Sequence, residues 1–585
     1  MKNKIDKSVM LTAVILCCLS YSCKKSEKIV EPPKVVGGGT TETPVITPVN
    51  DPVTASTMGF FLNDWKARTF AAPAYTETAL PAASSGNVVT VDASGIITKI
   101  PLSIFGHNAN TWMTPMHDQP MFMSQITNLQ PHIIRFPAGS GSDAYFWNQL
   151  QGVNPADAPA KIMDKDGAMK DPGYGYGKTD NNWQASLDNY YAMLQQSGNR
   201  GMITVNYGYA RYGTSNDPVA AAAHLAADWV RYVNGRTEYW EIGNETYGDW
   251  EWGYRIDLSK NKDGQPEYLT GKLYAQHVSV FADSMKKAAT EIGKTIYIGA
   301  TAYDSPTEGW QTNTVKTWNS SMLPELKGKN DFYIVHNYIT PYGQNSNAAT
   351  VLGSALSVPT AMMNFVSAQI KTYGAAEKPI ALTEWNMWAS GSKQQVSNTS
   401  GVFAVLVLGE ALKNKYAMAA RWDLLNGWGD GDDHGLFSDG GEPGIPKWTA
   451  RPSFYYLYYF QKVMGDRFIP TTVLGNANVK AYASTYTSGQ ANVTLVNTST
   501  TAMVVDVKTK NFNVGNRIYW YTLEGSNDNG EFSRKVSVNG SGTTLAAGGP
   551  ADYANLKARS AAVTNGIVRV NVPALGAVFV VMDKK

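Results

Sequence analysis

Cysteine and charge are both scarce in this chain of 585 residues. It contains 3 cysteines, and all of them lie within the first 23 residues. A folded part that begins after them has no disulfide and no thiol chemistry. Charged residues make up 17% of the chain, and the formal net charge is +2. A nearly neutral chain gives no electrostatic basis for binding nucleic acid, so we expect no such partner.

Several enzyme motifs are also missing. No Gly-x-Ser-x-Gly elbow follows a predicted strand, so Ser/His/Asp catalysis is unsupported. No zinc spacing is present, and no Gly-rich phosphate turn follows the first predicted strand. The run 430–435 has the acids of a calcium loop but lacks its full spacing and its closing Glu. We interpret this run as a substrate-contacting loop, with calcium as the alternative, and expect no metal and no cofactor.

The N-terminus has the pattern of a bacterial lipoprotein signal. Three lysines precede an apolar run, 9–19, which is too short for a comfortable transmembrane span. Cys23 follows as the residue to be lipidated, so 1–22 is predicted to be a signal peptide. Its removal takes away three Lys and one Asp, which changes the net charge from +2 to 0. We expect an exported protein anchored to the periplasmic or the cell-surface face of a membrane, with ordinary secretion as the alternative.

Residues 23–55 are rich in Lys, Pro, Thr, Val and Gly, which predicts a disordered tether. The part that follows, 56–100, is an extension with strand-like runs at 88–92 and 96–100. These strands are expected to join a second domain at the other end of the chain, which would make that domain discontinuous.

From residue 101 to 465 short apolar runs alternate with helical patterns. Eight strands that alternate with helices predict a (β/α)8 barrel, a TIM barrel of the α/β class. An open doubly wound sheet is the alternative. The predicted strands are 102–106, 132–136, 201–206, 238–242, 296–300, 332–336, 379–383 and 418–422. The clearest predicted helices are 183–195, 218–233, 273–292, 359–373 and 402–413.

After about residue 465 the helical period disappears, and short alternating runs separated by turn residues take over. This pattern predicts an accessory β-sandwich over 466–585. Its expected strands include 479–483, 491–496, 503–507, 518–521, 567–572 and 577–582.

Aromatic residues are abundant, with 32 Tyr and 16 Trp. Surfaces that are rich in aromatics and poor in charge are common where sugar rings stack, although any one ring can instead fill the core. A long loop, 139–182, contains Tyr145, Phe146, Trp147, Tyr174 and Tyr176. We expect it either to wall a polysaccharide cleft or to pack against the sandwich.

Polar and aromatic residues gather where the predicted barrel strands end. The carboxyl ends of the strands form the active-site face of such a barrel, and packing alone does not require these side chains there. The candidate site residues are Arg135, Asn206, Asn244, Glu245, His336, Tyr338, Glu384 and Trp422.

Glu245 and Glu384 form the pair on which the functional prediction depends. They end the fourth and seventh strands, which lie across the barrel from each other. Retaining glycoside hydrolysis needs two carboxyl groups about 5–5.5 Å apart, one as acid and base and one as nucleophile. The nucleophile must stay ionised, which Arg135 and Tyr338 suit, and the acid needs a less polar setting, which the Trp-rich loop after Glu245 suits.

The order of these motifs resembles the retaining glycoside hydrolases of clan A. The resemblance is strongest to glycoside hydrolase family 51 and its neighbours, which include α-L-arabinofuranosidases and some endoglucanases, and it covers about 96–430. The matching runs are 135–139, 205–208, 239–245, 336–338 and 383–386. It implies Glu245 as acid/base and Glu384 as nucleophile. It also implies that Asn244 binds the sugar hydroxyl beside the anomeric carbon and that Arg135 and Tyr338 support the nucleophile.

Two positions depart from the family 51 pattern. The family has a sugar-binding Glu after the first strand, where this chain has Asn110, and an Asn after the second strand, where this chain has Ser140. Both positions contact the sugar whose bond is cleaved. The departures weaken the expectation of arabinofuranose specificity and leave the catalytic pair unaffected.

Three hypotheses follow from the sequence. The first is an enzyme that cleaves within the backbone of a polysaccharide, such as a plant or algal glycan, or within its oligosaccharides. The second is an exo-acting α-L-arabinofuranosidase. The third is a non-catalytic surface lipoprotein that binds glycans, against which the presence of both Glu245 and Glu384 argues.

Overall fold

The computed structural model describes residues 46–585 except 345, 389, 390 and 392. The predicted signal peptide, Cys23 and most of the predicted tether lie outside the described residues. Residues 46–55 were assigned to the tether, but they run along the folded part. The backbone of Thr47 donates to Asn511 (2.8 Å), and Asp51 pairs with Arg467 (2.6 Å). Composition identifies a segment without a core but does not reveal such fixed polar contacts.

The predicted TIM barrel is confirmed, since eight parallel strands close into a ring in the order β10-β11-β12-β13-β14-β15-β4-β5. Seven of them lie within a few residues of the predicted runs. The first prediction was wrong, because 102–105 forms a 3-10 turn and the strand is β4 (Gly106–Asn108). The others are β5 (Ile133–Phe136), β10 (Arg200–Val205), β11 (Thr237–Ile242), β12 (Tyr297–Thr301), β13 (Phe332–Asn337), β14 (Ile380–Trp385) and β15 (Met418–Arg421).

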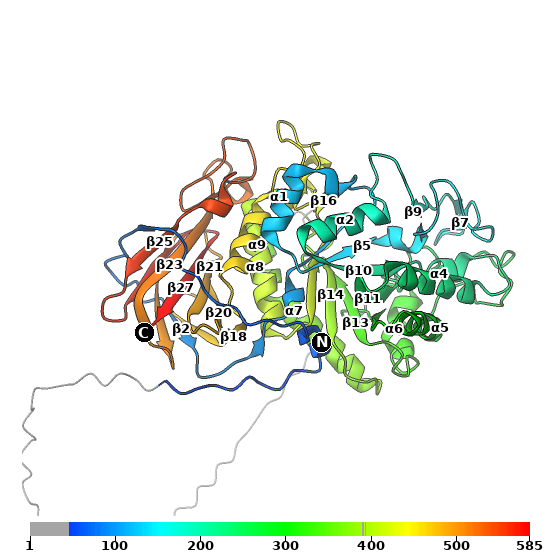
Figure 1. Cartoon of the computed structure of the whole chain (residues 1–585), viewed down its shortest axis with the longest axis horizontal. Helices are drawn as coiled ribbons and strands as arrows, with labels where there is room; N and C mark the ends of the chain where they lie inside the picture. Colours follow the sequence, from blue (N-terminus) through cyan, green and yellow to red (C-terminus); the bar gives the residue numbers. More distant parts are fainter. Residues whose placement is uncertain (1–45, 345, 389–390, 392) are drawn as a thin grey trace, which may run out of the picture. The chain divides into compact units, whose positions relative to one another are not determined.

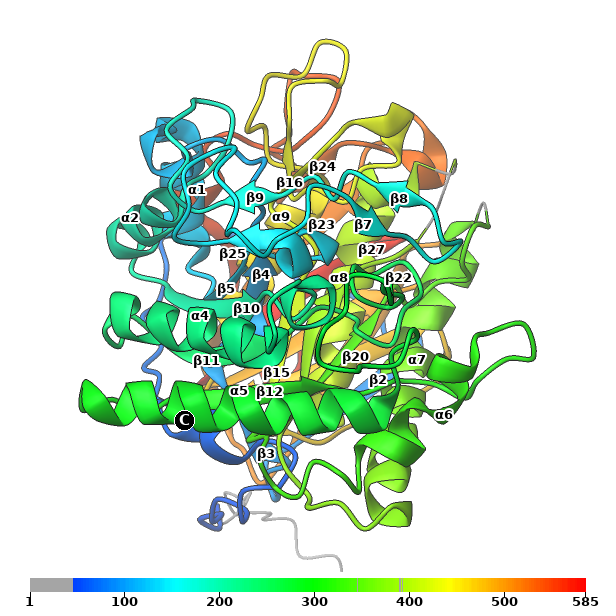
Figure 2. The same cartoon turned by 90° about the vertical axis from the view of Figure 1, so that its right-hand side faces the viewer.

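Helices surround the ring on its outside (Figure 1). Figure 2 looks onto α4 (Pro218–Val233) and α5 (Gly271–Glu291), which pack against each other in the outer layer. The principal helices are α1 (Pro120–Leu129), α2 (Leu187–Ser197), α4 (Pro218–Val233), α5 (Gly271–Glu291), α6 (Asn313–Met322), α7 (Ala348–Thr372), α8 (Asn398–Lys413) and α9 (Pro452–Val463). α7 begins eleven residues before its prediction and contains Pro359. It is long and apolar enough to cross a membrane, but here it packs against α8.

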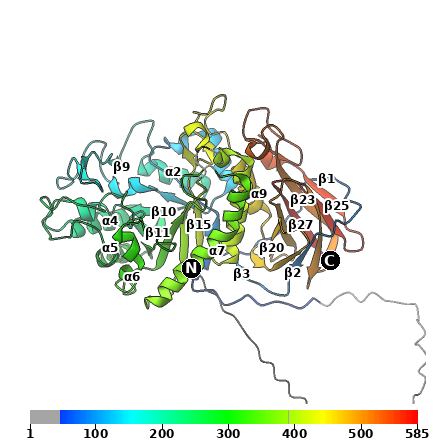
Figure 3. The same ribbon diagram turned by 180° about the vertical axis from the view of Figure 1, so that it is seen from behind.

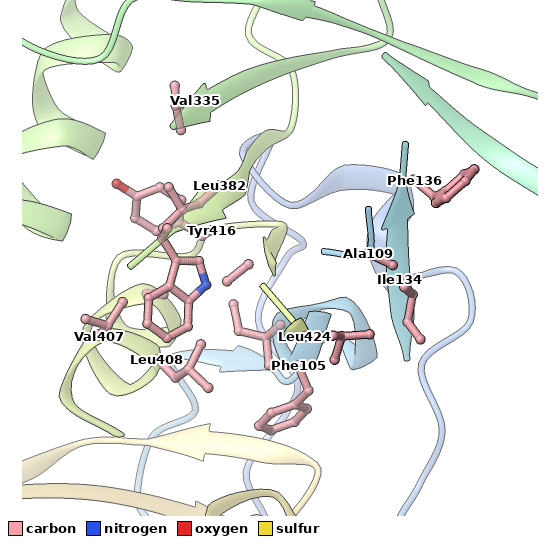
Figure 4. Close-up of a cluster of buried hydrophobic side chains, with 14 of the residues drawn as sticks. Phe105, Ala109, Ile134, Phe136, Val335, Leu382, Val407, Leu408, Tyr416 and Leu424 are labelled. Carbon is pink, nitrogen blue, oxygen red and sulfur yellow. The ribbon is translucent and has the colours of Figure 1, made fainter. Parts of the chain in front are cut away.

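The barrel strands are buried on both faces because each lies between the barrel interior and a helix. Figure 4 shows part of the resulting core, where Leu382 of β14 and Val407 and Leu408 of α8 belong to one buried cluster with Tyr416. A continuous core of this kind fixes the strand ends, and therefore the side chains that follow them.

A short turn of the N-terminal extension closes the amino-terminal end of the barrel. Phe61, in the 3-10 turn Gly59–Leu62, is 1% exposed and stacks on Tyr239 at 4.8 Å. Its neighbour Phe60 stacks on Tyr297 at 3.8 Å. The sequence predicted strands only at 88–92 and 96–100 of this extension, because two adjacent Phe residues carry no strand or helix period.

The C-terminal part forms two sheets. The larger has the order β1-β25-β23-β27-β21-β20-β18-β3, with β24 beside β23, and the smaller has the order β19-β2-β22-β26. Three strands come from the N-terminal extension: β1 (Tyr75–Glu77), β2 (Val88–Asp92) and β3 (Thr98–Lys99). The rest are β18 (Arg467–Ile469), β19 (Thr471–Leu474), β20 (Val479–Thr485), β21 (Ala491–Asn497), β22 (Met503–Lys510), β23 (Val514–Gly525), β24 (Val536–Val538), β25 (Ala558–Ala562), β26 (Val568–Val572) and β27 (Gly576–Lys584).

The larger sheet is buried on both faces. In β27, Val578 and Val580 belong to the core shared with the smaller sheet, while Phe579 and Val581 belong to the barrel core. This alternation follows from the period of two along a strand. Phe579 lies 6.5 Å from Phe460 of α9, so α8 and α9 separate the sheet from the barrel (Figures 1 and 3).

Three of the five aromatic rings named in the long loop 139–182 are buried within the barrel domain. Trp147 stacks on Trp229 of α4 at 5.8 Å and donates to the carbonyl of Leu225 (2.9 Å). Tyr145 and Phe146 are also buried in the barrel core. These three rings pack within the barrel domain, because bulky aromatic side chains gain more from burial than from exposure.

Candidate active site

Glu245 and Glu384 approach each other at the carboxyl end of the barrel. Glu245 is the third residue after β11, and Glu384 is the fifth residue of β14. One carboxylate oxygen of each and one ring nitrogen of His336 all lie within 4.8 Å of one another. This separation is short enough for both carboxyl groups to reach a single sugar ring.

Glu384 is held by two donors and is 4% exposed. The hydroxyl of Tyr338, just after β13, donates to Oε1 at 2.7 Å. Nη1 of Arg135 on β5 donates to Oε2 at 3.3 Å. The two contacts orient the carboxyl group, and Nδ1 of His336 lies 3.7 Å from its Oε2.

Arg135 is fully buried and is the centre of this network. Its guanidinium donates to Glu241 of β11, to Oδ1 of Asn108 (3.0 Å) and to Oδ1 of Asn244 (2.9 Å) as well as to Glu384. Glu241 was not predicted as a site residue. It points into the barrel and balances the guanidinium charge, which would otherwise be very costly to bury.

Glu245 receives donors of a different kind. The indole Nε1 of Trp250 donates to Oε2 at 3.0 Å, and Nδ1 of His336 lies 3.1 Å from Oε1. His336 is fixed from its other side by Oγ1 of Thr383 at 3.0 Å. The side chain of Glu245 is 17% exposed, which makes it the more accessible member of the pair.

Burial raises the pKa of both glutamates, and the donors and positive charges around them lower it. Burial raises the pKa of Glu384, which His336 and Arg135 only partly offset. Burial also raises the pKa of Glu245, but the hydrogen bonds from His336 and Trp250 outweigh it and lower that pKa. In the free protein the pKa of Glu384 is therefore raised and that of Glu245 is lowered.

Asn244 is held by two buried carboxyl groups that were not predicted as site residues. Its side-chain Nδ2 donates to Oε1 of Glu251 at 2.9 Å, and its backbone N–H donates to Asp143 at 3.2 Å. Burial raises the pKa of Glu251 well above its usual value and that of Asp143 to about 7. With Oδ1 bound to Arg135, the amide orientation is fixed and one N–H is left for a ligand.

The two departures from the family 51 pattern both contact a carboxyl group supplied from elsewhere in this chain. Nδ2 of Asn110 donates to Asp423, the second residue after β15, at 2.7 Å. Oγ of Ser140 donates to Glu251 at 2.7 Å. Acidic groups thus remain beside both positions but reach them from other loops. Glu251 lies in the Trp-rich loop 246–252, and it was the only sign in the sequence that a carboxyl group from another loop reaches one of these positions.

Six of the eight predicted site residues adjoin this network directly: Arg135, Asn244, Glu245, His336, Tyr338 and Glu384. Asn206 does not, because its amide bonds to Tyr145, Tyr209 and Tyr212 and is used up in holding the barrel loops. Trp422 follows β15, is 8% exposed and packs its ring on Gly139 beside Trp112. It lies in the wall of the barrel mouth without a contact to either glutamate among the described contacts.

The three groups that approach within 4.8 Å are ones that can also ligate a metal. Glu384 is already paired with the Arg135 guanidinium. A dication there would be repelled by this buried charge, so the residues suit proton transfer better than metal binding. In the run 430–435, Asp433 pairs with Arg451 and the ring of His434 lies 5.2 Å from Tyr338. These side chains are occupied by protein partners.

Comparison with known proteins finds relatives among curated sequences and among solved structures. No protein-family model matches the chain. The probable α-L-arabinofuranosidase C of Aspergillus terreus is 22% identical over 330 residues, which is 50% of this chain and 57% of the relative. The α-L-arabinofuranosidase C of Emericella nidulans is 23% identical over 331 residues, or 50% and 56%. The chain therefore spans a little over half the length of the curated relatives that it matches.

Solved structures match over more of the chain. The α-L-arabinofuranosidase of Thermotoga maritima covers 85% of this chain and 99% of its own, with a TM-score of 0.56 and 18% identity. A family 51 enzyme of Bifidobacterium longum covers 86% and 100%, with a TM-score of 0.58 and 15% identity. A family 44 xyloglucanase of Paenibacillus polymyxa covers 85% and 100%, with a TM-score of 0.54 and 11% identity.

The chain has the fold of clan A glycoside hydrolases near family 51. The resemblance inferred from the motifs is thereby confirmed, and so is the combination of a TIM barrel with a C-terminal β domain. At these identities the likeness shows the fold, and the chemistry has to be argued from the residues of this clan A fold.

Proposed function

We propose that this protein is a retaining glycoside hydrolase that cleaves within a polysaccharide, or within its oligosaccharides. The observation that carries the proposal is the separation of Glu245 and Glu384, whose nearest oxygens lie within 4.8 Å. Inverting enzymes need roughly 6.5–9.5 Å between their carboxyl groups to admit a water, whereas retaining enzymes need about 5–5.5 Å. The short separation supports a double displacement.

In the first step Glu384 attacks the anomeric carbon while Glu245 protonates the leaving oxygen. We assign these roles from the contacts, since Arg135 and Tyr338 are fixed donors to Glu384 and Glu245 is the more exposed group. The step needs a protonated Glu245 and an ionised Glu384. Positive charge that develops on the sugar beside Glu384 stabilises the ionised form of that carboxylate.

In the second step Glu245 acts as base. Glu384 is then an ester with no charge, so the repulsion that it exerts on the Glu245 carboxylate is gone. Glu245 removes a proton from a water that attacks the anomeric carbon, and the Glu384 carboxylate leaves. The remaining N–H of Asn244 is placed to bind the hydroxyl beside the anomeric carbon. No metal or cofactor enters this scheme.

Cleavage within a chain is supported by exposed aromatic rings on loops after the barrel strands, namely Trp112, Trp250, Trp310 and Tyr342, which are 42 to 84% exposed. A plant or algal glycan is the expected class of substrate. The exo-acting alternative, an α-L-arabinofuranosidase, is favoured by the names of the curated relatives. A non-catalytic glycan-binding lipoprotein would have no need for the donors that orient both glutamates.

We further propose that the protein is exported and attached to a bacterial membrane through lipid on Cys23, or is secreted. This rests on the sequence of the first 23 residues alone.

The chemistry is tested with Glu384→Ala on an activated aryl glycoside. We expect turnover to fall by on the order of 10⁴-fold or more, because the nucleophile is lost, while sugar binding persists. Glu238→Ala serves as the matched control, because the side chain of this Glu is 45% exposed and lies at the start of β11, at the opposite end of the barrel. Product sizing on a polysaccharide panel separates endo from exo action. Hydrolysis by Glu384→Ala at the wild-type rate would refute the nucleophile assignment.

A further inference from the structure

A row of aromatic rings leads from Glu384 to the solvent. Tyr338 donates to Glu384, and its ring lies 5.6 Å from that of Trp388 at 83°. Trp388 in turn lies 5.1 Å from Tyr342 at 31°, so these two rings are nearly parallel. Tyr342 is 82% exposed. We refer to Tyr338, Trp388 and Tyr342 as the aromatic row.

The row is held in place by the loops that carry it. The hydroxyl of Thr340 accepts from the backbone N–H of Trp388 at 2.6 Å and donates to its carbonyl at 2.5 Å. This ties the loop after β14 to the loop after β13. His434 packs on Trp388 at 5.7 Å from a third loop, and burial lowers its pKa to about 3, so it is neutral. The aromatic row is therefore a supported surface without charge of its own.

The packing of the fold does not explain why the ring of Tyr342 is exposed. A large ring left in water contributes no burial energy, and its ring partner among the described contacts is Trp388. The faces of aromatic rings carry partial negative charge and attract the weakly positive C–H groups of a sugar face. A neutral sugar chain is the ligand that matches an uncharged aromatic surface joined directly to a candidate nucleophile.

We propose that Trp388 and Tyr342 form a binding subsite for a neutral polysaccharide, which holds sugar residues of the chain beyond the one whose bond is cleaved. The subsite rests on the proposed function, since its position has meaning only beside the catalytic pair. It assigns the substrate to the class of extended, uncharged glycans and excludes short substrates as the preferred ones.

The test compares Tyr342→Ala, Tyr342→Phe and wild type. Tyr342 touches neither glutamate and is exposed, so the variants are expected to fold. On a neutral polysaccharide (arabinoxylan, xyloglucan or mixed-linkage β-glucan, whichever wild type cleaves) Tyr342→Ala should raise KM about three- to tenfold, the effect of one ring contact. Tyr342→Phe keeps the ring and should match wild type. On an aryl glycoside all three should have the same kcat/KM. Tyr75→Ala, an exposed Tyr of the sandwich, is the control.

Two sets of outcomes distinguish a failure of the subsite proposal from a failure of the proposed function. If the three proteins cleave aryl glycoside and polysaccharide with equal constants, the subsite is refuted and the hydrolase remains. If wild type cleaves neither, the hydrolase is refuted, and native gels containing each of the three polysaccharides then test the subsite alone. Retardation of wild type and Tyr342→Phe but not of Tyr342→Ala would support a glycan-binding surface. Equal migration of all three would overturn it.

Discussion

At the scale of single residues, the site depends on buried carboxyl groups that are not themselves reactants. Glu241 balances Arg135, and Glu251 with Asp143 holds Asn244. Glu245 and Glu384 could be predicted because each ends a recognisable strand and has a motif around it. Glu251 and Asp143 could not, because they lie in loops whose path no sequence period describes, and their partners are distant in the chain.

The protonation of Glu251 gives a prediction about pH. Its pKa is raised from 4.5, so the folded protein keeps a proton that the unfolded chain releases above about pH 4.5. Stability should therefore fall as the pH rises from that value toward the raised folded pKa. Glu251→Gln mimics the neutral acid and removes this term. We expect the variant to gain thermal midpoint relative to wild type as pH rises from 5 to 8, measured by calorimetry.

Glu251→Gln should also keep activity at neutral pH within about twofold, because the amide oxygen can accept from Asn244 and Ser140 as before. Glu251→Ala is the matched comparison and should lose activity, since Asn244 is then free to turn. Parallel stability curves for wild type and Glu251→Gln would show that Glu251 is ionised in the folded protein.

At the scale of elements, the barrel strands were predictable because each is a buried apolar run bounded by polar residues. The first was misplaced by a few residues, since the apolar residues Leu102, Ile104 and Phe105 lie in the 3-10 turn, while the strand itself is Gly106–Asn108. The beginning of α7 was missed because Pro359 looked like a start and is an interior residue. The 3-10 turn Gly59–Leu62 has no periodic signal at all, yet it closes the barrel end.

Phe61 in that turn should be important for stability. Its ring is 1% exposed and lies against Tyr239 and Phe332. Phe61→Ala should destabilise the protein by about 3–5 kcal/mol, the usual cost of removing a buried Phe. The adjacent Phe60, which is only partly buried, provides the control, and Phe60→Ala should cost less. Guanidinium unfolding checks both, and equal midpoints for Phe61→Ala and wild type would contradict this role of the turn.

At the scale of the whole molecule, the barrel and the sandwich share packing through α8 and α9. The side chain of Asn398 at the start of α8 donates to the carbonyl of Leu575 in the sandwich (2.7 Å). Strands β1, β2 and β3 come from before the barrel and complete both sheets. The two-part architecture was predictable from the change of period near 465. The order of strands was not, because pairing between distant segments leaves no local mark in the sequence.

The central claim is that Glu245 and Glu384 carry out a double displacement, and azide rescue tests it most directly. Glu245→Ala lacks the base for the second step, and azide is small enough to enter the space left by the side chain and attacks without a base. With an activated aryl glycoside, we predict that azide restores turnover and yields a glycosyl azide. Its anomeric configuration should be opposite to that of the Glu384 ester and therefore the same as that of the substrate. Absence of rescue, together with an inverted product from the wild-type protein, would contradict the account.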